Sequence, residues 1–386
     1  MKKICVVITA RSSYARVKSV LRELKKRQDV ELFLLTAGSL LLSKYGNALQ
    51  DIEKDGFLVN EKVHMGLENG DTVAMAKATA VGIIDFVTIF NNHTPDIVVS
   101  IADRFETIST AIAASYLNIP LAHIQGGEIS GSIDGKVRHA VTKFSSLHFV
   151  ANNLAAKRIR LMGEPDESIF VTGCPSIDLA KEIIEHPRHL TNEYFYSQYK
   201  GVGDMVDIDK PFVILLQHPV TTEWEEAYSQ MNETLMAVYD KKIPAIVFWP
   251  NADAGTDMLS KAIRTFREKY NPKGFYFLKH IPAEDFLTLL LKSRCVAGNS
   301  SVAIREGSFL GIPAVNIGTR QEGRERCTNV IDVQYSKNEI MKGLDYQLNR
   351  NHLYPSETLY GDGTAGAKIA SILAKHAPAI KKKFVE

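Results

Sequence analysis

Residues 97–124, IVVSIADRFETISTAIAASYLNIPLAHI, decide the fold class of this chain. They open with a short run rich in valine and isoleucine, continue with a longer segment of helical character, and end in a second short apolar run. The short runs are continuous rather than alternating, which is typical of strands buried in a parallel sheet. A strand, a helix and a second strand in this order predict an α/β doubly wound sheet.

The same alternation extends outward through the first half of the chain. Strands are expected at residues 3–10, 30–37, 97–101, 121–124, 147–151 and 170–172. Helices are expected between them, at residues 14–26, 72–90, 105–117, 136–144 and 154–161. This order predicts one complete Rossmann-like domain.

The pattern is lost at residues 186–210, which are polar and aromatic without a clear period, and then restarts. Strands are expected at residues 212–217, 245–249, 275–278, 295–298 and 314–317. Helices are expected at residues 223–239, 257–269, 283–292, 302–309, 337–350 and 365–376. Two similar halves predict two Rossmann-like domains in a GT-B arrangement, with the active site in the cleft between them.

The expected domain boundaries follow from this interruption. The first domain covers residues 1–185 and is rejoined by a C-terminal helix within 364–386. Residues 186–210 form a linker that carries some helix, and residues 211–363 form the second domain. A chain of 386 residues is too long for one ordinary core, which agrees with two domains.

Composition excludes several classes of protein. Lys plus Arg number 46 and Asp plus Glu 44, so the charge gives no reason to expect nucleic acid as a partner. No run of about eighteen apolar residues is apparent, so no membrane partner is expected and the cytoplasm is the expected location. The cysteines are scattered without a C-x-x-C pair, which predicts buried free thiols at Cys5, Cys174, Cys295 and Cys327. Neither G-x-G-x-x-G nor G-x-x-x-x-G-K-[ST] occurs, so the fingerprints of dinucleotide and P-loop binding are missing.

Acidic side chains follow two neighbouring strands of the first half, at the edge where doubly wound sheets bind ligands. Asp103 comes directly after the strand at 97–101, although a simple helix cap is the alternative. Glu128 and Asp134 lie in the glycine-rich loop after the next strand, unless that loop is a flexible turn with solvated acids. Carboxylates that converge raise one another's pKa, which suits proton transfer near neutral pH.

Basic side chains accompany these acids. Arg11 lies in the turn between the first strand and its helix, where an anion could bind at the helix N-terminus or a serine could simply cap it. Arg104 is adjacent to Asp103 and could meet a phosphate, and Arg138 lies one helical turn beyond Asp134. The first half is therefore expected to supply acid/base groups and cations to the cleft.

The second half offers a pocket for a nucleotide diphosphate. His218 ends its first strand and is a catalytic candidate, although a lone histidine is usually structural. Small polar residues before the helix at 302–309 offer backbone N–H groups and hydroxyls to phosphates, unless they serve only as an N-cap. The substrate-binding candidates of this half are Asn251, Asp253, His280, Gly298, Asn299, Ser300, Ser301, Glu306 and Arg320. Among them, Glu306 could accept the two ribose hydroxyls and Arg320 could add a cation.

Taken in order, these motifs resemble the hydrolysing UDP-N-acetylglucosamine 2-epimerases of bacterial sialic acid biosynthesis and the epimerase half of the animal bifunctional enzyme. The resemblance covers about residues 3–363. The matching motifs are ADRFET, QGGEISGSID, RHAVTK, GCPSID, QHPVTT, PNADAGTD, GNSSVAIREG, GTRQEGRE and YGDG.

The resemblance implies a reaction and roles for the residues. Enzymes of this family eliminate UDP across C1 and C2 to form a 2-acetamidoglucal, and water then gives N-acetylmannosamine, with no metal and no nicotinamide cofactor. Asp103 and Asp134 match acid/base carboxylates, and His218 matches the histidine of the cleft. The remaining matches are nucleotide-contacting positions, namely Arg11, Arg104, Asn251, Ser300, Ser301, Glu306 and Arg320. A nucleotide sugar is the expected partner, and a homodimer or homotetramer the expected assembly.

Two departures from the family pattern affect the expected chemistry. The family usually reads H-G-D-R where this chain has Ile101-Ala102-Asp103-Arg104. Its catalytic glutamate is replaced by Gln125, which we expect to bind substrate because an amide cannot exchange a proton near neutral pH. Either Glu128 takes over that role, or the site is tuned to another sugar.

Three alternatives to an epimerase of UDP-N-acetylglucosamine remain open at this point. The first is the same reaction on a UDP- or GDP-linked diacetamido-trideoxyhexose. The second is a GT-B glycosyltransferase, which needs an acceptor where an epimerase needs only water. The third is an inactive nucleotide-sugar binder, suggested by Gln125 alone.

Overall fold

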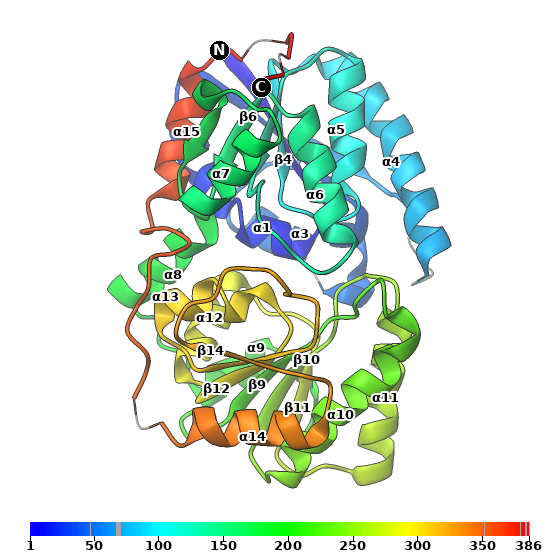
Figure 1. Ribbon diagram of the computed structural model, residues 1–386, viewed down its shortest axis with the longest axis vertical. Helices are drawn as coiled ribbons and strands as arrows, with labels where there is room; N and C mark the ends of the chain where they lie inside the picture. Colours follow the sequence, from blue (N-terminus) through cyan, green and yellow to red (C-terminus); the bar gives the residue numbers. More distant parts are fainter. Residues whose placement is uncertain (47, 67–70, 351, 379, 383, 386) are drawn as a thin grey trace.

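The computed structural model describes residues 1–386 except 47, 67–70, 351, 379, 383 and 386. It consists of two lobes, each built on one seven-stranded sheet (Figure 1). The sheet of the first lobe is parallel, with strand order β3-β2-β1-β4-β5-β6-β7. Its strands are β1 Lys2–Ile8, β2 Val30–Ala37, β3 Glu61–Val63, β4 Ile97–Ile101, β5 Leu121–Ile124, β6 Leu147–Val150 and β7 Ile169–Val171. This is the α/β fold that the sequence predicts.

The helices of the first lobe cover both faces of its sheet. They are α1 Arg11–Ala15, α2 Lys18–Lys25, α3 Ala48–Lys54, α4 Thr72–His93, α5 Thr107–Tyr116, α6 Ile133–Phe144 and α7 Asn153–Leu161, and α8 Pro175–Glu185 follows them towards the second lobe. The side chains between sheet and helices form two buried clusters, one on each face. Valine and isoleucine of β1 and β4 alternate between these clusters, which explains why the strands are apolar throughout.

The second lobe repeats the plan, with strand order β14-β13-β12-β9-β10-β11-β8. Its strands are β8 Val202–Gly203, β9 Val213–Leu216, β10 Ala245–Phe248, β11 Phe275–Leu278, β12 Cys295–Gly298, β13 Ala314–Ile317 and β14 Val330–Val333. Only β8 at the edge is antiparallel to its neighbour among the described strands. Its helices are α9 Asn192–Gln198, α10 Ala227–Asp240, α11 Thr256–Tyr270, α12 Ala283–Lys292, α13 Glu306–Leu310 and α14 Lys337–Leu348.

The segment expected to be a linker, residues 186–210, contains α9 and β8. Phe195 of α9 is fully buried in the cluster that also holds Ile214 and Ile246 of the second sheet. Ile177 and Ile183 of α8 lie in this same cluster, so α8 joins the two lobes. Part of the apparent irregularity of residues 186–210 therefore reflects short elements that pack on the second lobe.

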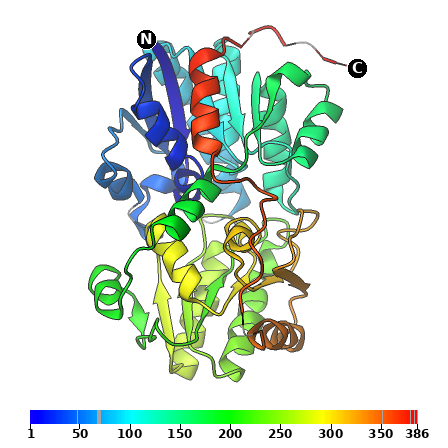
Figure 2. The ribbon, with the colours of Figure 1, turned by 90° about the vertical axis from the view of Figure 1, so that its left-hand side faces the viewer.

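The chain ends in the first lobe. Helix α15, Ala365–Lys375, packs against α2 and buries Ile369 and Leu373 in the first-lobe core (Figures 1 and 2). The C-terminal helix is therefore located where the sequence pattern predicts it.

Two observations test the expectations from composition, and the first confirms one of them. All four cysteines are buried and free, as predicted. Helix α4, however, is long and apolar enough by length and composition to cross a membrane, a property that the sequence analysis did not identify. A single such helix is weak grounds for a span, because core helices share these properties. One face of α4 indeed packs on the first lobe through Phe86 and Phe90.

Candidate active site

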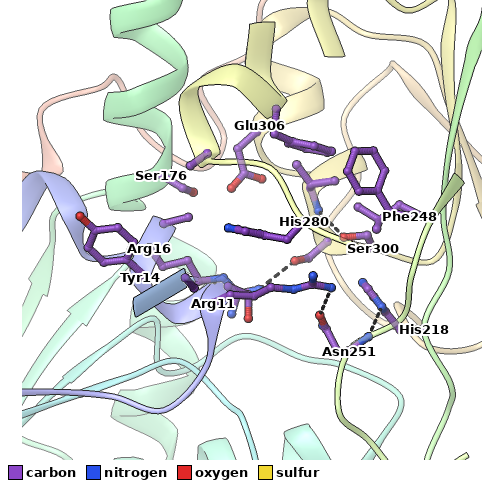
Figure 3. Close-up of a pocket in the computed structure, with 18 of the residues that line it drawn as sticks. Arg11, Tyr14, Arg16, Ser176, His218, Phe248, Asn251, His280, Ser300 and Glu306 are labelled. Atoms are coloured by element: carbon purple, nitrogen blue, oxygen red, sulfur yellow. Dashed lines mark hydrogen bonds between the residues drawn. The ribbon is translucent and has the colours of Figure 1, made fainter. Parts of the chain in front are cut away.

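A cleft between the two lobes collects most of the residues that the sequence analysis singled out (Figure 3). Its lining includes the predicted residues Arg11, Asp103, Arg104, Asp134, His218, Asn251, His280, Ser300, Ser301, Glu306 and Arg320. The other predicted residues do not line it; these are Gln125, Glu128, Arg138, Asp253, Gly298 and Asn299. The carboxyl ends of the parallel strands of both sheets meet at this cleft, as expected for a doubly wound fold.

Asp103 lies at the carboxyl end of β4, and two arginines hold its carboxylate. Arg138 donates to Oδ2, and Nη1 of Arg16 lies 3.3 Å from Oδ1. Arg138 is fully buried and also donates to the Glu128 carbonyl oxygen at 2.8 Å, so it fixes Asp103 relative to the neighbouring loop. The preceding Ala102 has a positive φ of 60°, a conformation that favours glycine.

His123 holds this turn through a hydrogen bond to its backbone. Its Nε2 lies 2.8 Å from the Ala102 carbonyl oxygen, so Nε2 carries a proton and donates it to that bond. Burial lowers the pKa of His123 to about 4, which keeps the ring neutral. Because the ring stays neutral, its Nε2–H remains the donor that holds the turn before Asp103.

Asp134 lies in the first turn of α6 and points to the cleft. Ser132 caps this helix and accepts a hydrogen bond from the Asp134 backbone N–H at 3.3 Å. Burial raises the pKa of the Asp134 carboxyl, and Asp253 adds to the rise, while Arg320 and Arg104 oppose it. Nη2 of Arg320 lies 3.3 Å from Oδ2. A buried carboxyl with a raised pKa beside a cation suits proton transfer at the cleft.

Glu128 has a different environment, although it belongs to the same loop. It is fully buried, and both Arg305, at 2.5 Å, and Arg324 donate to its Oε2. Burial alone would raise the pKa of this carboxyl, but attraction to Arg305 and Arg324 outweighs burial and lowers it. A permanently ionised group behind the cleft lining favours an anchoring role over proton transfer.

Gln125 also lies behind the lining. Its backbone has a positive φ of 69°, and its Nε2 donates to the Cys174 sulfur at 2.5 Å. The Cys174 sulfur in turn lies 2.9 Å from Oγ of Ser176, which lines the cleft. Within the part of the chain that the structure describes, Cys174 and Ser176 connect Gln125 to the cleft.

His218 is fixed at the tip of β9 by Asn299. The Asn299 amide accepts from the His218 backbone N–H at 2.7 Å and donates to its carbonyl oxygen at 2.8 Å. The backbone N–H of Asn251 donates to Nδ1 of the ring at 3.2 Å. Burial lowers the pKa of His218 far below its ordinary value, and the charges of Arg320 and Arg11 lower it further. The ring is thus neutral with its proton on Nε2, which makes it a hydrogen-bond donor.

The loop after β12 carries the residues that the sequence analysis expects to bind the nucleotide. Gly298 has a φ of 131°, and a Cβ there would lie 2.2 Å from the Leu216 carbonyl oxygen, so only glycine fits. Ser300 caps the short helix that follows, and Ser301 accepts from Nη2 of Arg16 at 2.9 Å. Glu306 lines the cleft, and its Oε2 has no hydrogen-bond partner among the described residues.

Arg11 connects the lobes at the cleft rim. Its guanidinium donates to the Tyr45 carbonyl oxygen in the first lobe at 2.9 Å. It also donates to the Trp249 carbonyl oxygen at 3.1 Å, to the Asn251 side chain at 3.2 Å, and to the Lys279 carbonyl oxygen. Burial and the nearby Arg104 lower the pKa of Arg11 to about 10.

Arg104 and His280 make two further contacts between the lobes. Arg104 donates to the Asp253 carboxylate and, at 3.0 Å, to the Ala252 carbonyl oxygen. Nε2 of His280 lies 2.6 Å from the Asp51 carboxylate. Asp253, expected to bind substrate, here serves as the partner of Arg104.

Several lining residues were missed by the sequence analysis. Arg16 contacts both Asp103 and Ser301, and Arg324 lies 4.0 Å from Asp103. Their proximity to the acids was not visible in the sequence, because the contacts span long separations along the chain. The apolar end of the cleft was also missed; it is lined by Leu216, Phe248, Pro282, Phe286 and Leu287. Among the described residues, no group of three or more His, Cys, Asp or Glu side chains could hold a metal ion.

Comparison with known proteins gives consistent matches over nearly the whole chain. A family model described as UDP-N-acetylglucosamine 2-epimerase matches residues 22–374. The chain is 33% identical to a hydrolysing UDP-N,N'-diacetylbacillosamine 2-epimerase of Legionella pneumophila, over 97% of this chain and 96% of that protein. It is 32% identical to polysialic acid biosynthesis protein P7 of Escherichia coli, over 89% of this chain and 86% of that protein.

A solved structure gives the corresponding match in fold. The UDP-GlcNAc 2-epimerase of Methanocaldococcus jannaschii, in complex with UDP-GlcNAc and UDP, has a TM-score of 0.81 against this chain at 18% identity. The match covers 97% of this chain and 100% of that one. The GT-B arrangement predicted from the sequence is therefore confirmed.

Proposed function

Because the chain belongs to the UDP-N-acetylglucosamine 2-epimerase family, we propose that it is a hydrolysing 2-epimerase that converts UDP-N-acetylglucosamine to N-acetylmannosamine and UDP. The observation that carries the proposal is the pair Asp103 and Asp134, which line one side of a cleft whose other side offers Ser300, Ser301 and Arg320. Acid/base groups thus face a site suited to a leaving diphosphate.

The reaction proceeds in two balanced steps. A base removes the proton from C2 while the bond between C1 and the diphosphate oxygen breaks, and UDP leaves with the electron pair. The product of this anti elimination is a 2-acetamidoglucal with a double bond between C1 and C2. Water then adds to this double bond. Its hydroxyl bonds to C1, and a proton is delivered to C2 on the face opposite to the one from which the first proton was removed. This inverts C2 and releases N-acetylmannosamine.

We assign the two proton transfers to the carboxyls that line the cleft. Asp103 accepts hydrogen bonds from Arg138 and Arg16, which hold it in place as the base at C2. Asp134 has a raised pKa caused first by burial, which suits the delivery and removal of protons when water adds.

The leaving group is stabilised by groups of both lobes. Arg320 and Arg16 neutralise charge that develops on the diphosphate, and His218 donates a hydrogen bond from Nε2 as a neutral ring. The Glu306 carboxylate, which lines the cleft, accepts a ribose hydroxyl. Gln125, Glu128 and Arg138 act from behind the lining by holding the loop that carries Asp134.

A second substrate is favoured by one specific observation. The Legionella relative, at 33% identity over almost the full chain, is named for UDP-N,N'-diacetylbacillosamine. That nucleotide sugar shares the 2-acetamido group and UDP, so the same elimination applies to it. The replacement of the family glutamate by Gln125 agrees with a site tuned to a sugar other than N-acetylglucosamine.

The test compares both nucleotide sugars in deuterated water without any acceptor. We expect stoichiometric UDP, and a 2-epimerised sugar that carries deuterium at C2, from the true substrate. Faster turnover of the diacetylbacillosamine compound would select the second candidate. Release of UDP only when an acceptor is added would instead indicate a glycosyltransferase, and an epimerised product without deuterium at C2 would rule out elimination.

A further inference from the structure

The loop between β5 and α6, residues 125–132, docks on the second lobe. The backbone N–H of Gly131 donates to the Arg320 carbonyl oxygen at 3.2 Å, in the loop after β13. The backbone N–H of Ile133, the first residue of α6, donates to Oγ1 of Thr221 at 3.3 Å, in the loop after β9. The start of α6 is therefore held by hydrogen bonds from its backbone to the other lobe.

Gly131 brings the two backbones closer together than a side chain permits. A Cβ on this residue would lie 2.4 Å from the Thr319 carbonyl oxygen, and its nearest contacts would all be with Thr319 and Glu322 of the second lobe. The φ of Gly131 lies outside the left-handed region, so its backbone conformation would accept alanine. The close approach of the second lobe, rather than the conformation of the loop, therefore explains the glycine.

The docking contact extends along most of the loop. Gly323, in the loop after β13, lies so close that a Cβ on it would be 2.8 Å from Cγ2 of Ile129. Glu128 accepts hydrogen bonds from Arg305 and Arg324, which also belong to the second lobe. The path of this loop towards α6 is thus fixed by groups of the other lobe.

Arg320 joins the docked loop to both halves of the proposed chemistry. Its carbonyl oxygen accepts from Gly131, while Nη2 of its guanidinium lies 3.3 Å from Oδ2 of Asp134. Its Nη1 donates to the Asn299 carbonyl oxygen at 3.4 Å, next to the serines of the proposed diphosphate site. One residue of the second lobe therefore contacts the loop, the acid/base carboxyl and the loop that faces the leaving group.

We propose that docking of Gly131 on the backbone of Thr319 and Arg320 positions Asp134 for proton transfer, which makes Gly131 a positioning residue of the reaction. This inference rests on the proposed function, in which Asp134 transfers protons and the second lobe binds the diphosphate. The first lobe supplies the carboxyl, and the second lobe sets its distance from the substrate. Such a distance matters, because a displacement of about 1 Å can cost about 10²-fold in rate.

Gly131→Ala tests this role, because its methyl group meets the second lobe and leaves the first lobe unstrained. We expect kcat to fall about 10²-fold as the two loops separate. The affinity for UDP, measured by isothermal titration calorimetry, should stay close to wild type, since the proposed diphosphate groups remain in place. Gly343→Ala is the matched control, because this glycine of α14 is also buried and its added methyl group would meet side chains of its own lobe. It should leave kcat and KM unchanged.

A double variant separates positioning from a general structural defect. If Gly131 acts through Asp134, the variant Gly131→Ala/Asp134→Asn should be no slower than Asp134→Asn, because the carboxyl that the docking positions is already missing. Two independent defects would instead multiply their effects on kcat.

Amide hydrogen exchange of residues 129–133 measures the docking without any substrate. We expect faster exchange in Gly131→Ala than in the wild type, because the amide of residue 131 loses its acceptor. Unchanged exchange, an unchanged kcat, or multiplied losses in the double variant would each overturn the inference, even if the wild type is an active epimerase. A wild type that turns over neither nucleotide sugar, yet shows the expected difference in exchange, would contradict the proposed function and with it the positioning role, while supporting the docking contact.

Discussion

Asp134 and Glu128 lie six residues apart, both are buried, and their pKa values are shifted in opposite directions. Burial raises the pKa of both carboxyls. Glu128 receives hydrogen bonds from Arg305 and Arg324, and their attraction outweighs burial. Asp134 has one cation, Arg320, at 3.3 Å, and the neighbouring Asp253 adds to the effect of burial. Within this pair, the two guanidinium groups in contact with Glu128 account for its lowered pKa, whereas the single cation beside Asp134 does not outweigh burial.

The largest expected effect is on catalysis, at the Asp134 end of the loop. We expect Asp134→Asn to lower kcat by about 10²–10⁴, the usual effect of removing a positioned acid or base. The KM should change little, because the amide keeps the shape of the side chain. Initial rates of UDP release measure both parameters. Asp257→Asn, on the exposed surface of α11, is the control, and an Asp134→Asn enzyme of near normal kcat would show that the two carboxyls do not differ as described.

At the Glu128 end we expect a loss of stability instead. Glu128→Gln leaves the buried Arg305 and Arg324 without their counter-charge, and breaking a buried ion pair typically costs about 3–5 kcal/mol. Urea unfolding at neutral pH measures this loss, with the exposed Glu268→Gln as control. The kcat per folded enzyme should fall less than in Asp134→Asn. If Glu128→Gln unfolds like the wild type but has no activity, Glu128 is an acid/base group and not an anchor.

The pH dependence of stability separates the two carboxyls further. Because the folded pKa of Glu128 is below the ordinary value of 4.5, the unfolded chain binds this proton more readily than the folded protein. The stabilisation by Glu128 is therefore complete above pH 4.5 and is lost as the pH falls through the lower folded value. We expect the difference in unfolding free energy between wild type and Glu128→Gln to shrink over that range. A difference that is constant with pH would argue against a lowered pKa.

A smaller effect is expected at Gln125, the start of the same loop. Its amide contacts the Cys174 sulfur and does not line the cleft. We expect Gln125→Ala to cost about 1–3 kcal/mol of stability through the lost contact and the partner left unpaired. Activity should fall by about tenfold at most, because Ser176 at the cleft loses only indirect support. Complete inactivity of a folded Gln125→Ala enzyme would place Gln125 in the catalytic machinery.

The smallest expected effect concerns the turn before Asp103. Ala102 has a φ of 60°, where an L side chain costs about 1–2 kcal/mol relative to glycine. We expect Ala102→Gly to raise the free energy of unfolding by about 1 kcal/mol, measured by urea unfolding, without altering either carboxyl. A destabilised variant would mean that the alanine methyl group contributes more through packing than its backbone conformation costs.

The sequence was most informative where strands are buried on both faces. The central strands β1, β4, β5, β9, β10 and β12 were predicted within a few residues, because their continuous apolar runs are unmistakable. Edge strands β3 and β14 are short and partly exposed, so they lack that signal and were not predicted. The bounds of helix α9 could not be predicted for a similar reason, because Phe195 is the one fully buried side chain among its seven residues.

The site was predictable only in part, because sequence locates a residue at the end of a strand but not its depth or its partners. Asp103, Asp134 and His218 follow strands and indeed line the cleft. Glu128 looked equivalent to Asp134, because Arg305 and Arg324, which fix its charge, are far away in the sequence. Arg16 was overlooked for the same reason, since its partner Ser301 belongs to the other lobe.

The position of α15 has a consequence for how the chain is made. The core of the first lobe includes Ile369 and Leu373, and Lys2 of β1 donates to the Leu373 carbonyl oxygen at 2.7 Å. During translation these residues leave the ribosome after the whole second sheet. Domains usually fold in the order of synthesis. The second lobe can therefore complete its core before α15 of the first lobe has been synthesised. Until then, the nascent first lobe exposes the surface of α2 that α15 later covers.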